Sequence, residues 1–302
     1  MNISDSPQQA AFRAEVREWI ETRVPPHLKG RRQGIVQGPG LWGDALKPLE
    51  EAAAEKGWRA PAWPQQHGGA GFDLGQMVIF KEECDRAGVP ERHTTGVGML
   101  GPILMKYGTE QQKKRFLGPT LSGEITWAQG YSEPQAGSDL ANLTMKCEVT
   151  AGGFVLNGQK IWTSGAHEAE WIFVLVRTDK TRERRQQGIS FLLADMKSPG
   201  ITIRDILTID GFHHFNEVFF DDVEVPADQL VGELNDGWTV AKALLGHERF
   251  THPVADPFRI GKALDNLKAT AREIPAGNGV VWDDPRIRHR VLEMEMEIDC
   301  MR

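Results

Sequence analysis

The sequence predicts an α+β fold with an N-terminal helical domain, a middle antiparallel β-domain and a C-terminal helical domain that forms an incomplete helical bundle. Apolar residues recur at helical spacing from Ser6 to about Leu121, and helical spacing returns from Asn235. Between them, from Thr126 to Pro226, lie short segments rich in β-branched and aromatic residues. Because helices and strands are grouped instead of alternating, the pattern favours separate regions over βαβ units. We place the domains at residues 1–124, 125–232 and 233–302.

The N-terminal region is predicted to be mostly helical. A first helix carries Phe12, Val16, Trp19 and Ile20 on one face, and Pro25-Pro26 end it. Leu46, Leu49 and Ala53 indicate a second helix. Two glycine-rich passages separate the helices: RRQGIVQGPG is expected to be a loop, and HGGAGFDLGQ an irregular turn before a helix through MVIFKEECDRAG.

The middle region reads as a set of short strands. TMKCEVT alternates Met145, Cys147 and Val149 on one face, and Gly152-Gly153 predicts a tight turn into the next strand. Asn157-Gly158 is the strongest two-residue hairpin signal in the chain. Four further strands are expected at WIFVLVRTD, GISFLLADM, ITIRDIL and NEVFFDDVEV.

Composition excludes several classes of protein. The chain has 302 residues, of which 40% are apolar and 25% charged, so it is expected to be globular. A formal charge of −7 and a pI near 5.8 argue against general nucleic-acid binding, and the basic run KTRERR is expected to be a solvated loop. Cys84, Cys147 and Cys300 have no metal spacing and indicate a reducing compartment. With no leader and no apolar run long enough for a membrane span, we expect a cytoplasmic protein.

The stretch from Trp127 to Trp171 carries the strongest functional signal. Ser132, Ser138 and Ser164 are short donors beside glycines and strand ends, where backbone amides can also reach a flat or phosphorylated ligand. No Gly-x-Gly-x-x-Gly follows a strand, so a Rossmann dinucleotide site is not expected. The stretch predicts a cofactor site of another kind.

Five motifs in order along the chain then identify a family. They are YGTEQQKKRFLGP, YSEPQAGSDLAN, NGQKIWTSG, NEVFFDDVEVP and GWTVAKALLGHER, which begin at Tyr107, Tyr131, Asn157, Asn216 and Gly237. Together they resemble the FAD-dependent acyl-CoA dehydrogenases. The resemblance implies the three domains above, FAD held between the last two and across a subunit interface, and an oligomer, either a dimer or a tetramer.

The resemblance also implies roles for individual residues. Ser132 matches the hydroxyl that binds the pyrimidine side of the flavin, Ser164 matches the one near N5, and Trp162 matches the residue that packs on the ring. Considered singly, each has a structural alternative, a core tryptophan or turn-capping serines. Gln135 departs from the family's usual glycine and leaves the turn geometry open. The remaining contacts implied are Gln129, Gly130, Tyr131 and Thr163 around the flavin, and Ser138 on the CoA part of the substrate.

Dehydrogenation also needs a base, and Glu248 is the candidate. Val240, Leu244 and Glu248 are spaced i, i+4, i+8 and share a helix face, where a carboxylate is costly unless paired or functional. Glu248-Arg249 matches one of the two places where the family carries its catalytic glutamate. A buried ion pair is the alternative role for Glu248, and Arg249 is either a substrate contact or a structural one. His247 lies one position off this face and is expected to be a surface or packing residue.

The expected reaction is α,β-dehydrogenation of an acyl-CoA thioester to the 2-enoyl-CoA, with electrons passed to an electron-transfer flavoprotein in fatty acid or lipid catabolism. The chain ends at Arg302, whereas the family continues through further helices that carry the alternative glutamate loop and contacts to the FAD adenosine. One alternative is therefore a non-catalytic or half-site subunit of a heteromer. A second alternative, within the same chemistry, is an oxygen-using flavoenzyme of the same fold. The last helix is expected to need an outside cover over its apolar residues Val291, Leu292, Met294, Met296 and Ile298.

Overall fold

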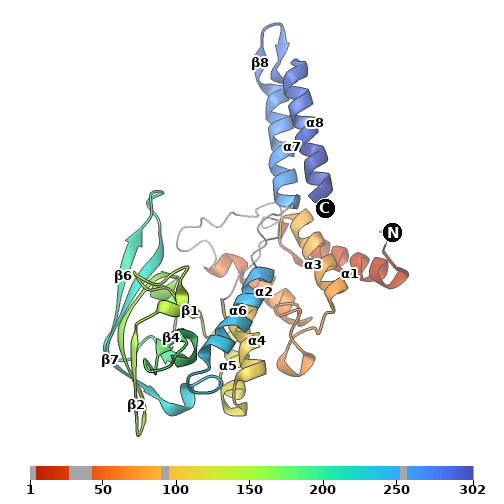
Figure 1. The fold of residues 1–302 in the computed structure, drawn as a ribbon. Coiled ribbons are helices and arrows are strands. Elements are labelled where there is room, and N and C mark those ends of the chain that lie inside the picture. The colour runs from red at the N-terminus through yellow and green to blue at the C-terminus, as the bar shows by residue number, and fades with distance from the viewer. Residues whose placement is uncertain (1–4, 27–42, 90–94, 252–256, 302) are drawn as a thin grey trace. The chain divides into compact units, whose positions relative to one another are not determined.

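The computed structural model describes residues 5–26, 43–89, 95–251 and 257–301 (Figure 1). The chain divides into two compact units, residues 1–34, 72–91 and 253–302 in one and residues 35–71 and 92–252 in the other. The expected loop at Arg31 to Gly40 lies outside the described residues, and the domain boundaries stay a prediction. None of the described helices is long and apolar enough to span a membrane.

The first unit is helical, with one small β-hairpin. Its elements are α1 (Pro7–Arg23), α3 (Leu74–Ala87), α7 (Pro257–Glu273), β8 (Pro275–Ala276), β9 (Gly279–Val280) and α8 (Pro285–Met301).

Local signals set where the first two of these helices begin. Ser6 and Gln9 form a capping box at the start of α1, and Asp73 and Gln76 form one at the start of α3. Each box satisfies backbone N–H groups that an uncapped helix leaves free.

A buried carboxylate joins α1 to α3. Glu83 of α3 is 3% exposed and accepts from Arg13 at 2.7 Å and from Arg17 at 2.7 Å. The two guanidinium groups hold the pKa of Glu83 below its ordinary value, although burial by itself would raise it. The carboxylate is therefore charged and paired within the helical unit.

The helices α7 and α8 cover part of each other's apolar surface. Val291 and Ile298 of α8 are buried with Leu264 of α7, so the expectation that the whole apolar row needs an outside cover is wrong for these two residues. The reason is that the chain turns back at the β8–β9 hairpin. Leu292 and Met296 remain more than half exposed.

The second unit holds a seven-stranded sheet and its covering helices. Its helices are α2 (Gly43–Ala54), α4 (Gly101–Tyr107), α5 (Glu110–Ser122) and α6 (Gly237–Thr251). Its strands are β1 (Trp127–Gly130), β2 (Lys146–Thr150), β3 (Gly153–Ser164), β4 (Trp171–Arg177), β5 (Ile189–Asp195), β6 (Ile201–Leu207) and β7 (His213–Pro226).

The strand order is β1-β4-β2-β3-β7-β6, with β5 paired to β4. The order of helices, sheet and helices confirms the predicted fold class. Most pairs are antiparallel, as expected, but β1 and β2 both run parallel to β4.

Both faces of β4 are buried. Phe173 and Leu175 point into a core shared with α4, α5 and α6, whereas Ile172, Val174 and Val176 point into a second core formed with β2, β3 and β7. This is why WIFVLVR reads as a continuous apolar run instead of alternating. Figure 1 shows α4, α5 and α6 beside the sheet.

The predicted hairpin at Asn157-Gly158 is wrong. Both residues lie inside β3, at a register shift against β7. Gly158 has φ +148°, and a Cβ there would stand 2.9 Å from Met145, so the bulge needs glycine. Asn157 donates to the Asp222 carboxylate at 2.8 Å across the strands.

The tight turn between β2 and β3 is confirmed, and it spans Ala151 and Gly152, with Thr150 paired to Gly153. The predicted apolar face of β2 is only partly correct. Met145 and Cys147 are buried, but Val149 is 52% exposed because it lies at the end of the strand, beyond the core.

Candidate active site

The end of β1 and the end of β3 lie side by side. The Ile161 amide donates to the Ser132 carbonyl at 2.9 Å, which brings the segment after β1 against the last residues of β3. Ser132 is half-buried and Ser164 is exposed. The structure thus gathers two of the predicted hydroxyls where β1 and β3 end. This end of the sheet, from Ser132 and from Ile161 to Ser164, is called the open edge below.

Trp162 lies at a strained bulge on that edge. Its φ is +59°, which is rare for a bulky residue, and the β3–β7 register shifts between Lys160 and Thr163. The side chain is 57% exposed and packs edge-on against Phe215, with ring centroids 6.0 Å apart. Trp162 is therefore not a core residue, and the bulge turns its ring toward the surface.

Thr163, next along the bulge, is held by β7. Its carbonyl accepts from the side-chain amide of Asn216 at 2.9 Å, and Asn216 is fully buried. The Thr163 hydroxyl oxygen is also buried and has no hydrogen-bond partner in the described part of the chain. Asn216 stands at the start of the NEVFFDDVEVP motif, but nothing in the sequence singled it out as a support for β3.

A buried ion pair stabilises the same edge. Lys160 lies 2.9 Å from Glu133 and donates to the Tyr131 carbonyl at 3.1 Å. Burial lowers the pKa of Lys160 to about 8, against the opposing charge of Glu133, so the ammonium persists at neutral pH. Sequence reasoning missed Lys160, although a lysine between the apolar residues of β3 was a signal.

Gln135, the residue that left the turn geometry open, lies in a closed turn. Glu133 and Ala136 exchange two backbone hydrogen bonds at 2.9 Å, which closes a tight turn around Pro134 and Gln135. The Gln135 amide donates to Glu133 at 2.8 Å and to the Thr144 hydroxyl at 2.7 Å. Its side chain joins a network that glycine could not make.

The residues at the end of β1 pack inward. A Cβ on Gly130 would stand 2.6 Å from Val174, so packing against β4 already requires glycine there. Tyr131 is 5% exposed and its ring lies edge-on to Phe173 and Phe191. Gln129 is half-buried and pairs with Phe173 in the ladder. Gly130 can offer a ligand only its backbone atoms.

Glu248 lies at the inner face of α6. Val240 and Leu244, which the sequence placed on the same helix face as Glu248, are buried in the core. Glu248 is half-buried, and its Oε2 atom is out of contact with solvent. Burial and then the charge of Glu248 raise the pKa of Tyr131 well above its usual value. The structure therefore brings the candidate base near the end of β1. The side chain of Arg249 lies outside the described residues.

Ser138 lies apart from this group, on an exposed bend after the Glu133–Ala136 turn. A Cβ on the preceding Gly137 would meet nothing within 4 Å, so the bend faces open space. The structure places Ser138 where a large ligand could reach it.

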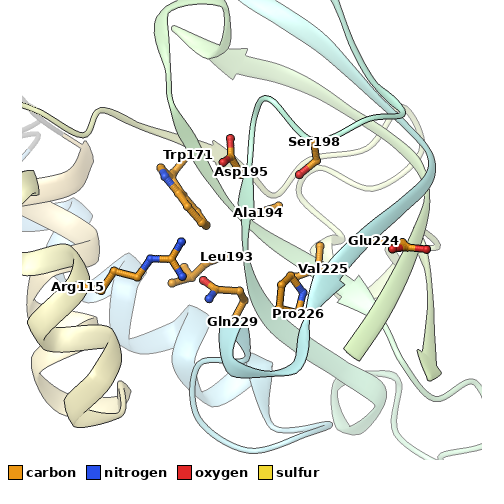
Figure 2. Close-up of a pocket in the computed structure, with 10 residues that line it drawn as sticks. All are labelled: Arg115, Trp171, Leu193, Ala194, Asp195, Ser198, Glu224, Val225, Pro226 and Gln229. Carbon is orange, nitrogen blue, oxygen red and sulfur yellow. The ribbon is translucent and has the colours of Figure 1, made fainter. Parts of the chain in front are cut away.

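The cavity in Figure 2 contains none of the predicted site residues. It has a volume of about 270 Å³ and lies between α5, β5 and the end of β7. Arg115 lies over the Trp171 ring at 4.9 Å there, and Gln229 borders the cavity floor formed by Leu193 and Val225. The predicted site is instead the open edge that carries the exposed Trp162 ring.

The models of three domains of one protein family match successive parts of this chain. The acyl-CoA dehydrogenase N-terminal domain matches residues 6–124, the middle domain residues 128–223 and the C-terminal domain residues 235–302. The chain belongs to the acyl-CoA dehydrogenase family. The expectation of an oxidoreductase of this family is confirmed, and members of the family generally depend on FAD.

Relatives of this acyl-CoA dehydrogenase are similar over almost its whole length. Acyl-CoA dehydrogenase IpdE1 of Mycobacterium tuberculosis is 40% identical over 298 residues, which cover 96% of this chain and 74% of that protein. Acyl-CoA dehydrogenase FadE29 of the same organism is 36% identical and covers 93% of this chain.

Solved structures show the same fold. The Tcur3481-Tcur3483 steroid ACAD has a TM-score of 0.82 and 33% identity, covering 100% of this chain and 75% of that chain. The ChsE4-ChsE5 complex from Mycobacterium tuberculosis has a TM-score of 0.78 and 29% identity, covering 99% of this chain and 75% of that chain.

The residues at the open edge of this acyl-CoA dehydrogenase fit a flavin. An exposed indole is held out of the core by a strained bulge, and Ser132 and Ser164 lie on the segments that meet there. A flat ring with polar edges needs this combination of an aromatic face and short donors.

Proposed function

We propose that this protein is an FAD-dependent enzyme that dehydrogenates an acyl-CoA thioester between its α and β carbons. The observation that carries the proposal is the place of Glu248 on a face of α6 whose residues Val240 and Leu244 share a buried core with Tyr131. The charge of Glu248 acts on Tyr131, and Tyr131 immediately precedes Ser132, whose carbonyl is bonded to the Trp162 bulge. A carboxylate thus lies near the edge that presents the aromatic ring and the hydroxyls.

FAD, when bound, supplies the acceptor for the hydride that leaves the β carbon. The Glu248 carboxylate takes the proton from the α carbon, and the electrons of that C–H bond form the double bond of the 2-enoyl-CoA. We assign Ser132, Ser164 and Trp162 to holding the flavin ring, as the polar and aromatic surface of this edge supports. The further assignments are Gln129, Gly130, Tyr131 and Thr163 as flavin contacts and Ser138 and Arg249 as substrate contacts.

Flavin bleaching tests the role of Glu248. The protein loaded with FAD is mixed anaerobically with an acyl-CoA, and loss of flavin absorbance is followed. Glu248→Gln keeps the shape and removes the base, so the bleaching rate should fall on the order of 10²-fold to 10⁴-fold. The matched control is Glu233→Gln, an exposed carboxylate on the loop before α6. A Glu248→Gln protein that retains FAD and bleaches at the wild-type rate would remove Glu248 from the mechanism.

We further propose a bulky, ring-containing acyl group as the substrate class. The support is the similarity to the protein named a steroid ACAD, at 33% identity. The same bleaching assay with butyryl-CoA, palmitoyl-CoA and a steroid-type acyl-CoA should favour the last. Equal or faster bleaching with palmitoyl-CoA would overturn this choice without affecting the reaction type.

We propose an electron-transfer flavoprotein as the electron acceptor, with oxygen as the alternative. The reduced protein should reoxidise slowly in air and quickly with an electron-transfer flavoprotein. Rapid reaction with air would favour an oxygen-using flavoenzyme of the same fold.

Assembly with a different subunit is the second candidate. Two similar structures carry paired protein names, Tcur3481-Tcur3483 and ChsE4-ChsE5, which favours a heteromer. In that case the chain purified alone should be colourless and should gain FAD on mixing with its partner. A yellow chain that bleaches alone would show a self-sufficient oligomer.

A further inference from the structure

Tyr131 carries a buried hydroxyl that the fold leaves without a hydrogen bond in the described part of the chain. The residue is 5% exposed, so water does not readily replace the missing partner. Buried hydroxyls in proteins are almost always bonded, because leaving one unpaired forfeits the bonds it made to water. Such a hydroxyl calls for a functional explanation.

The tyrosine ring has little freedom to search for a partner. Phe173 and Phe191 pack edge-on against it, with ring centroids 6.0 Å and 6.4 Å away. The Tyr131 carbonyl is in turn held by Lys160 at 3.1 Å. Because the ring is fixed, a hydrogen-bond partner must move toward the Tyr131 hydroxyl.

Glu248 is placed to do this. Tyr131 belongs to the same buried cluster as Val240 and Leu244, which lie on the face of α6 that continues to Glu248. The glutamate carboxylate ends a flexible, half-buried side chain, and its charge is felt at the phenol. A phenol with its proton in place is a donor, and a carboxylate is the strongest acceptor a protein offers it.

We propose that Tyr131 is a positioning residue for Glu248, whose carboxylate accepts a hydrogen bond from the buried Tyr131 hydroxyl and is thereby fixed beside the reacting α carbon. This inference rests on the proposed function and extends it to the placement of the base.

The composition of the chain allows a direct spectroscopic test, because it has only two tyrosines, Tyr107 and Tyr131. With tyrosine labelled with ¹³C at Cζ, the full-length protein gives two signals, which Tyr107→Phe and Tyr131→Phe assign. The Tyr131 signal should move in Glu248→Gln, because a neutral amide is a weaker acceptor than a carboxylate, and the Tyr107 signal should stay where it is. The proposal is overturned if the Tyr131 signal behaves identically in wild type and Glu248→Gln.

Kinetics supply the second test. Tyr131→Phe keeps the ring between Phe173 and Phe191 and deletes the hydroxyl, so kcat for flavin bleaching should fall on the order of tenfold, with KM little changed. Tyr107→Phe, in a residue that packs against the same cluster from α4, should leave both unchanged.

The two tests separate this inference from the proposed function. If no acyl-CoA bleaches the wild-type protein, the proposed function fails, and the ¹³C comparison still decides whether Tyr131 and Glu248 are bonded. If bleaching occurs but Tyr131→Phe matches the wild type in kcat, dehydrogenation stands and the positioning role is overturned.

Discussion

Lys160 and Glu133 form an ion pair of 2.9 Å in which 0% of the lysine side chain and 2% of the glutamate side chain are exposed. The pair connects the segment after β1 to the middle of β3, just before the Trp162 bulge. Glu133 also accepts from the amides of Thr144 at 2.7 Å and Met145 at 3.0 Å. Buried charges thus stabilise the edge that carries the candidate flavin residues.

Removing one partner of this pair should strongly destabilise the protein. Glu133→Gln leaves the Lys160 ammonium buried without its counter-charge, and we expect the unfolding free energy to drop by about 3–5 kcal/mol. Urea denaturation measures it. The control is Glu148→Gln, which breaks the exposed Lys146–Glu148 pair of the same 2.9 Å length and should change little. Equal effects of the two substitutions would contradict a structural role for the buried pair.

The same carboxylate should make stability depend on acid. Burial alone would raise the pKa of Glu133, but Lys160 and the Thr144 and Met145 amides hold it below its ordinary 4.5. Because the folded-state pKa is the lower one, this stabilisation is complete above about pH 4.5 and is lost as pH falls through the folded-state value. As the pH is lowered from about 7 to about 3, the free energy of unfolding should fall more steeply in wild type than in Glu133→Gln. Parallel curves would show that Glu133 does not contribute.

Trp162 should reveal backbone strain when it is truncated. Glycine tolerates the positive φ and alanine does not, so Trp162→Gly should be more stable than Trp162→Ala by about 1 kcal/mol. At Val155, an ordinary position on β3, the order should reverse, because glycine weakens a regular strand. Thermal or urea unfolding of the four variants decides this. Both Trp162 variants should also bind FAD more weakly than wild type.

Cys147 should be inert in the folded protein. It is 5% exposed, and burial raises the pKa of its thiol to about 12, so the reactive thiolate is scarce at neutral pH. Cys300 on α8 is exposed. Brief treatment with iodoacetamide followed by peptide mapping should find Cys300 modified and Cys147 modified only after unfolding. Modification of Cys147 in the native protein would indicate that the core of the sheet opens readily.

Local patterns predicted much of the fold. ITIRDIL coincides with β6, and the first predicted helix is α1, which buries Val16, Trp19 and Ile20. These predictions depend on interactions between residues close in sequence, or on a side-chain period that the sequence displays directly. The same holds for Val240 and Leu244, whose helical spacing correctly predicted the buried face of α6.

Predictions failed where the partner strand decided the conformation. Asn157-Gly158 has the composition of a hairpin turn, yet β7 pairs on both sides of it and converts it to a bulge inside β3. A dipeptide of this composition is compatible with several local structures, and a distant segment selects among them.

The sequence by itself determined the family, the order of helices and strands, and the glutamate that shares the apolar face of α6. Only the tertiary structure decided that Lys160 supports Glu133, that the Trp162 ring leaves the core, and that the Tyr131 hydroxyl lies buried near Glu248. Tyr131 and Glu248 are far apart along the chain, and no period or motif joins residues at that separation. Their proximity follows from packing α6 against the sheet, which depends on the burial of the whole core and not on any local pattern.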